Sequence, residues 1–341
     1  MLAIGGCAKF DYLYEQSVGQ ISLQSKARDN QEMLKNVRVP AEQKDKIRKI
    51  GALKKYFYKY WGKKETAIYS QTTMLQNKAV TYLVIASPYQ EIKAYETCFP
   101  VMGCFPYLGF FNLEQAKKFA KQKEAENFVT WLRPVYAYST LGYFTDTILS
   151  SFFHYTDYEL AELIFHELFH TIFFINNEVE LNENLANYFA KEMLEDYFTQ
   201  ANQLDYLHIE QKEELEDKIL RKMVVGLAAE LQEHYQKLLP QNKEDSEAIL
   251  DEFLEKKFKP DILKKCQEIN IPPKNCFPIQ RQWNNASFAA FLTYEKKSDD
   301  LEGLRKKLGL DLRGYYLFIN KKHNDFKNQS EVPEFSKYLF L

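Results

Sequence analysis

The chain has 341 residues, of which 45% are hydrophobic and 27% charged, with a formal net charge of −2. This length allows one large domain or two ordinary ones with a substantial core. The near-neutral charge excludes the basic field of a nucleic-acid-binding protein, so no nucleic-acid partner is expected, and no apolar run approaches the roughly 20 residues of a transmembrane helix.

The first residues, MLAIGGCAKF, resemble the processing site of a bacterial lipoprotein, where the signal is cut before a cysteine that is then lipidated. Cys7 would be the lipidated residue and residues 1–8 a processing remnant. A full signal has an apolar stretch of about 7–15 residues, so we expect a trimmed chain or a start further upstream. The alternative is an ordinary buried cysteine near a frayed terminus.

The residue pattern of the next part of the chain changes from one typical of helices to one typical of strands. Apolar spacing predicts helices over about 9–62, with Pro40 in a turn or at a first helical position. Residues rich in β-branched and aromatic side chains predict strands over about 66–138, interrupted by a helix at LEQAKKFAKQKEA. The predicted strands are TAIYSQTT, VTYLVIAS, IKAYETCF, CFPYLGFF and ENFVTWLRPVYAYS.

Four further cysteines fall into two local pairs. Cys98 and Cys104 are six residues apart, and Cys266 and Cys276 are ten apart. This arrangement suits two short disulfide loops in an oxidising compartment, although four reduced buried thiols remain the alternative. No CxxC pair occurs, so a structural zinc ribbon is not indicated.

After residue 155 the pattern is helical, including a charged amphipathic stretch near 206–258 whose glutamates and lysines form a solvated face. The sequence therefore predicts an α+β fold, predominantly helical, with a mixed β-sheet in the N-terminal half. We expect a single domain over 9–341, in which 9–154 supply helices and sheet and 155–341 supply the helical half.

The segment LIFHELFHTIFF contains the candidate metal-binding and catalytic residues. Thr156 and Glu159 form a T-x-x-E capping box that predicts a helix over 157–175. His166 and His170 are four residues apart, so they project from one face and can bind the same ion. Glu167 can reach a water on that ion as general base, which makes this an H-E-x-x-H zinc motif. With six histidines in the chain, chance predicts on the order of 0.01 such motifs.

A catalytic zinc needs a third protein ligand and an open position for water. Glu183, thirteen residues after His170 in a second predicted helix, is the best candidate. Glu178 and Glu180 lie in the expected connection and are weaker candidates. Asn187, one turn beyond Glu183, either hydrogen-bonds a ligand histidine or is an ordinary surface residue.

At these residues the sequence resembles the bacterial predicted-aminopeptidase family, a gluzincin-like group of metallopeptidases whose members are often lipoproteins. The resemblance covers most of the chain. It rests on GCAKFDYLYEQSVGQISL, FPYLGFF, RPVYAYSTLGYFTDTILSSF, LIFHELFHTIFF, NENLAN and NNASFAAFLTY, in that order.

The resemblance implies a zincin-like helix pair with one Zn²⁺ bound by His166, His170 and Glu183, and with Glu167 as base. It implies a peptide substrate. Because members of the family are often lipoproteins, we expect a periplasmic protein anchored to the cell envelope through lipidated Cys7. Two features depart from thermolysin-type enzymes: the interval from His170 to Glu183 is shorter, and Asn187 stands where those enzymes have an acidic residue.

The sequence does not decide which residue donates a hydrogen bond to the oxyanion or which residue binds the amine of the substrate. Tyr138, with Tyr136, is a candidate donor because a strand before the metal helix edges the cleft in such enzymes. The competing donors are Tyr188, Arg281 and Tyr294. An aminopeptidase also needs an anionic anchor for the substrate amine, for which Glu162 is one candidate.

The competing hypothesis is a non-catalytic envelope lipoprotein whose zinc joins two helices. Such a structural site closes all four positions with protein ligands. His154 would have to supply the fourth ligand by folding back toward the histidine pair.

Overall fold

The structure is a computed structural model that describes residues 4–99, 103–137, 145–176, 178–293, 299–328 and 332–341. The chain divides into two compact units. The first unit comprises Met1–Ile21, Ala79–Tyr136 and His208–Lys296, and the second comprises Ser22–Lys78, Ala137–Leu207 and Lys297–Leu341. The expectation of a single domain over 9–341 stays a prediction.

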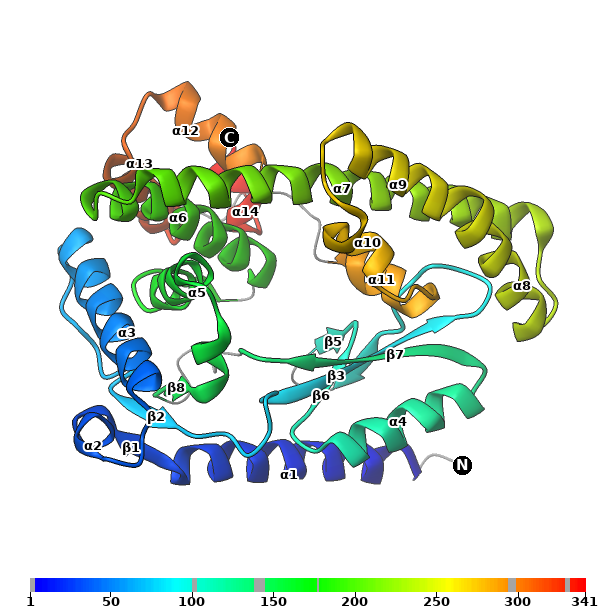
Figure 1. Cartoon of the computed structure of the whole chain (residues 1–341), viewed down its shortest axis with the longest axis horizontal. Helices are drawn as coiled ribbons and strands as arrows, with labels where there is room; N and C mark the ends of the chain where they lie inside the picture. Colours follow the sequence, from blue (N-terminus) through cyan, green and yellow to red (C-terminus); the bar gives the residue numbers. More distant parts are fainter. Residues whose placement is uncertain (1–3, 100–102, 138–144, 177, 294–298, 329–331) are drawn as a thin grey trace. The chain divides into compact units, whose positions relative to one another are not determined.

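The first unit contains an antiparallel sheet with strand order β6-β3-β7. The central strand β3 is buried on both faces, as its nearly continuous apolar run requires. Val84 packs toward α4, whereas Leu83 and Ile85 pack against Ala286 and Ala290 of α11. Figure 1 shows α4 and α11 on opposite sides of these strands. The elements are β3 (Thr81–Pro88), β6 (Leu108–Phe110), β7 (Phe128–Val135), α4 (Leu113–Ala125) and α11 (Asn285–Thr293).

The helix α4 and the long strands match their predicted positions. Asn112 caps α4 by accepting hydrogen bonds from the backbone of Glu114 and Gln115. The predicted strand IKAYETCF is mostly irregular, because the backbone N–H groups of Ile92 and Lys93 donate to side chains, those of Gln232 and Ser87, rather than to another strand. Only its end forms a strand. That end is β4 (Thr97–Phe99), which pairs with β5 (Gly103–Phe105).

Two disulfides lie in the first unit. Cys98 and Cys104 are directly opposite each other in the β4–β5 pair and are joined. Cys266 and Cys276 are joined in the helical part, where both are buried. The four cysteines thus form the two local pairs that the sequence suggested.

The expected amphipathic stretch 206–258 is helical but not continuous. It breaks after α7, where Leu239 has a left-handed φ of 48° and Pro240 follows. The helical elements of this region are α7 (Leu204–Leu238), α8 (Lys243–Phe253), a π-helical turn η2 (Leu254–Phe258), α9 (Lys259–Glu268), η3 (Pro273–Asn275) and α10 (Phe277–Gln280).

The second unit contains a small mixed sheet with strand order β1-β2-β8, in which β2 and β8 are parallel. The strand β1 corrects the prediction of unbroken helix between residue 9 and Pro40. The residues after α1 (Ile4–Ser25) pair with β2, and Asp29 then caps α2. The elements are β1 (Ala27–Asp29), α2 (Asn30–Lys35), α3 (Ala41–Tyr60), β2 (Gln71–Thr73) and β8 (Ile148–Leu149).

Helices α3, α5 and α6 form the core of the second unit (Figure 1). Aromatic side chains fill the space between them: Phe57 lies against Phe165, and Phe169 stacks on Phe189 with ring centres 4.7 Å apart. This packing holds α5 rigidly. The remaining elements are η1 (Ser150–His154), α5 (Asp157–His170), α6 (Val179–Gln200), α12 (Asp299–Leu308), α13 (Leu312–Phe326) and α14 (Phe335–Leu339).

The predicted α+β class is confirmed, with mostly helix and small mixed sheets in the N-terminal half. The predicted end of the metal-site helix at residue 175 is wrong, because α5 ends at His170. The following residues, Thr171 to Ile175, are β-branched or aromatic and disfavour helix, and the Thr171 hydroxyl donates to the carbonyl of Leu168. Within the described helices, none is both long and apolar enough to cross a membrane.

Candidate metal centre

The first two members of the centre, His166 and His170, come from α5. Thr156 and Glu159 form the predicted capping box at its start. Leu160, Ile164 and Leu168 are fully buried, so the helix has a fixed rotation in the unit. The two histidines are neighbours because they are four residues apart on one face, and this rotation leaves 15% of the His166 side chain and 5% of the His170 side chain exposed.

The connection from α5 to α6 is held by Asn182. Its side chain accepts a hydrogen bond from the backbone N–H of Ile175 at 2.9 Å and donates to the carbonyl of the same residue at 2.7 Å. Asn182 is 2% exposed, so these two bonds lie in the interior. They fix the short loop to the first turn of α6, and the next residue in that turn is Glu183.

Glu183 meets both histidines. One carboxylate oxygen, Oε2, lies 3.4 Å from Nε2 of His166, and Oε1 lies 3.5 Å from Nε2 of His170. The two Nε2 atoms are 3.3 Å apart. Both carboxylate oxygens thus face the two imidazole nitrogens, and within the described parts of the chain these residues form a group, with one ligand atom from each within 4.8 Å of the others, that could hold a metal ion.

Asn187 fixes the tautomer of one ligand. Its Oδ1 lies 2.8 Å from Nδ1 of His166. Because an amide oxygen only accepts, Nδ1 of His166 carries the proton and donates it, which leaves the lone pair of Nε2 directed at the centre. His170 lacks such support from the described residues, since its buried Nδ1 makes no hydrogen bond with any of them.

The charges of the three residues depend on one another. Burial acts to lower the pKa of His166, but the hydrogen bond with Glu183 and the charge of Glu167 raise it above the ordinary value. Burial and the neighbouring His166 lower the pKa of His170 to about 4. Burial acts to raise the pKa of Glu183, yet the histidines lower it overall. At neutral pH His170 is thus neutral and Glu183 ionised, as metal ligands must be, whereas a metal ion would have to compete with the proton that Glu183 and Glu167 favour on His166.

Glu167 is buried beside this group, with 9% of the residue exposed. Its charge raises the pKa of His166. The pKa of Tyr69 is raised mainly by burial and, in second place, by the charge of Glu167. Tyr69 is also buried and has a left-handed φ of 58°, a strained conformation for an aromatic residue. The backbone N–H of Tyr69 donates to the carbonyl of Asp146 at 2.8 Å. No local pattern in the sequence marks Tyr69, since its proximity to Glu167 arises only from the fold.

The other predicted ligands lie elsewhere. Glu178 occupies the N-cap position of α6, where it accepts a hydrogen bond from the backbone N–H of Ser336 at 3.1 Å. Glu180 is exposed in the first turn of α6. Glu178 thus lies at the end of the connection, as expected, whereas Glu180 belongs to the helix. His154 is exposed, and in the described parts of the chain it does not belong to the metal-binding group.

The structure describes some of the candidate oxyanion donors but not all of them. Tyr138 and Tyr294 lie outside the described residues. Tyr136 and Arg281 belong to the first unit, and the centre belongs to the second. Tyr188 is on α6, but its hydroxyl accepts a hydrogen bond from Arg305 at 3.2 Å. Glu162, the candidate anchor, is half-buried one turn before His166.

A second cluster of possible ligand atoms, Glu96 with Cys98 and Cys104, lies in the first unit. It is exposed, and its two cysteines form a disulfide, so neither offers a thiolate. The histidine-glutamate group is therefore the better candidate of the two.

Comparison with known proteins identifies the family of the chain. Residues 11–331 match the model of a family described as "Putative aminopeptidase". The match spans most of the chain, so the chain belongs to this family. No curated protein and no solved structure matches the chain significantly. The resemblance stated from the sequence is thereby confirmed at the level of the family.

Proposed function

We propose that the chain is a gluzincin-type, zinc-dependent peptidase in which His166, His170 and Glu183 hold one zinc ion. The spacing of the ligand atoms carries the proposal. A tetrahedral zinc ion with ligands at about 2.0–2.1 Å requires ligand atoms about 3.3–3.4 Å apart. The two Nε2 atoms are 3.3 Å apart, and each lies 3.4–3.5 Å from one oxygen of Glu183, Oε2 for His166 and Oε1 for His170, so every nitrogen–nitrogen and nitrogen–oxygen contact is close to that spacing.

Access to the centre also fits a catalytic site. The Glu183 side chain is 44% exposed, so the centre is open on the side of that carboxylate. A catalytic zinc site uses three protein ligands and leaves the fourth position for water or substrate. A structural site would need a fourth protein ligand, and the exposed His154 is not in the described group.

The proposed reaction is hydrolysis of a peptide bond. Zinc, when bound, supplies Lewis-acid chemistry that makes water acidic near neutral pH and polarises the scissile carbonyl. Glu167 accepts the proton of the attacking water and delivers it to the nitrogen of the leaving amine. Asn187 holds His166 in the tautomer that directs Nε2 at the centre. Tyr138 remains the proposed donor to the oxyanion.

The family description supports an aminopeptidase, which removes the first residue of a peptide. We further propose that the protein acts in the bacterial cell envelope, in the periplasm, attached to the membrane through lipidated Cys7. The two disulfides in the first unit support an oxidising compartment.

Zinc content tests the ligand set. Elemental analysis of the purified protein should find about one zinc per chain, and the Glu183→Ala variant should lose most of it. The matched control is Glu195→Ala, an exposed glutamate of the same helix, which should keep its zinc. Failure of the wild-type protein to bind zinc, even in excess metal, would overturn the proposal.

The Glu167→Gln variant tests the chemistry separately. It removes the proton acceptor without removing a ligand, so it should retain zinc and lose peptide hydrolysis by at least about a hundredfold. Unchanged hydrolysis in this variant would show that Glu167 is not the base.

A further inference from the structure

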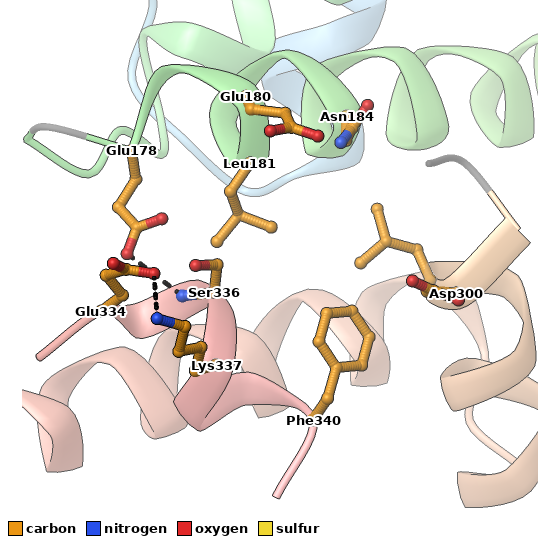
Figure 2. A pocket seen from close by; sticks show the side chains of 10 residues that line it. Glu178, Glu180, Leu181, Asn184, Asp300, Glu334, Ser336, Lys337 and Phe340 are labelled. Carbon is orange, nitrogen blue, oxygen red and sulfur yellow. Dashed lines mark hydrogen bonds and ion pairs between the residues drawn. The ribbon is translucent and has the colours of Figure 1, made fainter. Parts of the chain in front are cut away.

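A cavity of about 430 Å³ lies in the second unit, bounded by α6, α12 and α14. Figure 2 shows Leu181 of α6 and Phe340 facing the cavity from opposite sides, with Glu180 and Asn184 on the α6 side and Asp300 on the α12 side. Leu181 is buried, as is Leu301, which also lines the cavity. The cavity therefore has an apolar wall and an acidic rim.

The carboxylates of the rim differ in their partners. Glu178 accepts the hydrogen bond from Ser336, and Glu334 forms an ion pair with Lys337 at 3.0 Å (Figure 2). Glu180 and Asp300 form no ion pair with any other described residue. The five charged side chains lining the cavity comprise four acids and one lysine, which gives a net charge of −3.

The arrangement favours an organic cation over a metal ion. Among the described residues, the carboxylate oxygens of this rim do not form a group close enough to hold one ion, whereas those of the histidine centre do. A metal ion would also gain nothing from the apolar side chains. An ammonium group attached to an apolar body matches both parts of the lining.

Two residues that line the cavity are close in sequence to Glu183 of the metal centre. Glu180 is three residues before Glu183, and Asn184 is the residue after it. On a helix, residues three apart are neighbours with Cβ atoms about 5–6 Å apart. The amine of an aminopeptidase substrate lies within one residue, about 3.8 Å of chain, of the carbonyl that is attacked. A carboxylate one helical turn from Glu183 is therefore at a suitable distance to bind the substrate amine.

We infer that this cavity binds the first residue of the peptide substrate. Glu180 and Asp300 receive the protonated α-amine, and Leu181, Leu301 and Phe340 receive an apolar side chain. This inference rests on the proposed function, since it assigns a subsite next to the proposed zinc. It replaces Glu162 as the anchor, and an amine bound here would direct cleavage to the first peptide bond of the substrate.

Binding can be measured without turnover in the zinc-loaded Glu167→Gln protein. The probes are leucyl-leucine amide and its N-acetylated form, titrated by calorimetry. Acetylation removes the positive charge, so it should weaken binding at least about tenfold. Adding Glu180→Gln or Asp300→Asn should weaken the free-amine peptide about five- to tenfold and leave the acetylated one unchanged. The control is Glu302→Gln, an exposed glutamate of α12 paired with Lys306, which should change neither.

Equal binding of the two peptides, or free-amine binding that is unchanged in both rim variants, would overturn the inference. These outcomes are distinct from failure of the proposed function. If wild-type zinc protein hydrolyses neither peptide but the selective binding persists, the peptidase proposal fails and the amine site stands. If it hydrolyses both equally and binding is unselective, the peptidase stands and the amine site fails.

Discussion

Nδ1 of His166 lies 2.8 Å from Oδ1 of Asn187, a residue one turn beyond Glu183 on α6. The same helix therefore supplies both a candidate ligand and the group that orients another ligand. Nothing else in the described chain offers His170 an equivalent partner for its Nδ1. The two histidines are thus supported unequally, and the metal affinity should depend strongly on Asn187.

Replacing Asn187 by alanine should reduce zinc affinity about 10- to 100-fold, because His166 loses the acceptor that fixes its tautomer. Replacing it by aspartate should restore or raise the affinity, because a carboxylate accepts the same bond and makes the imidazole more basic. Competition with a chromophoric chelator measures both values, with Glu195→Ala as control. Equal affinity in wild type and Asn187→Ala would contradict this role.

Asn182 should matter mainly for stability. The Asn182→Ala variant leaves the N–H of Ile175 without its partner and its carbonyl with only the 3.4 Å hydrogen bond from the N–H of Glu178, which should lower the free energy of unfolding by about 1–3 kcal/mol. Urea denaturation measures the change. Asn182→Asp should also destabilise, because a carboxylate accepts from the N–H but repels the carbonyl.

The control for this position is Asn324→Ala, an exposed asparagine within α13, which should change stability by less than about 0.5 kcal/mol. If Asn182→Ala were as stable as this control, the loop would not depend on the two bonds.

The ion pairs at the start of α5 should stabilise the folded protein at neutral pH and lose this effect in acid. Asp157 forms ion pairs with Lys46 and Lys49 of α3. Burial acts to raise the pKa of Asp157, but the hydrogen bonds from both lysines lower it overall. Because the folded pKa lies below the unfolded value of about 3.9, this stabilisation is complete above that pH and is lost as pH falls through the folded value.

Asp157→Asn should therefore cost about 1 kcal/mol at pH 7, a small value because the carboxylate is partly exposed. The difference from wild type should shrink toward zero as the pH falls through the lowered pKa of Asp157. Thermal unfolding across this pH range measures it. Glu114→Gln is the control, since Glu114 also sits in a first helical turn but pairs only with a neighbouring exposed lysine. A deficit that persists unchanged at low pH would refute the electrostatic origin.

Local patterns predicted much of the fold and of the centre. The capping box, the i, i+4 histidines and the Asn112-capped α4 all depend on residues within one or two turns. The end of α5 was not predicted, because it depends on Thr171 and on Ile175 being held by Asn182 from the next helix.

Features that join distant segments were also missed. Tyr69 reaches the neighbourhood of Glu167 from about a hundred residues away. The cavity combines α6 with Asp300 and Phe340, which lie more than a hundred residues later. No spacing within one segment carries such information, so only the folded chain brings these residues together.

Removal of zinc should loosen the second unit selectively. An ion bound only by the folded state stabilises it by about 4 kcal/mol at a thousandfold excess over its dissociation constant. His166, His170 and Glu183 join α5 to α6, so chelation should increase hydrogen exchange in these helices. Amides of β3 and α11, in the first unit, should be unaffected. Hydrogen-exchange mass spectrometry with and without EDTA measures this, and the Glu183→Ala variant should show no response to the chelator. A uniform response of both units, or the same response in the variant, would show that the effect does not arise at this centre.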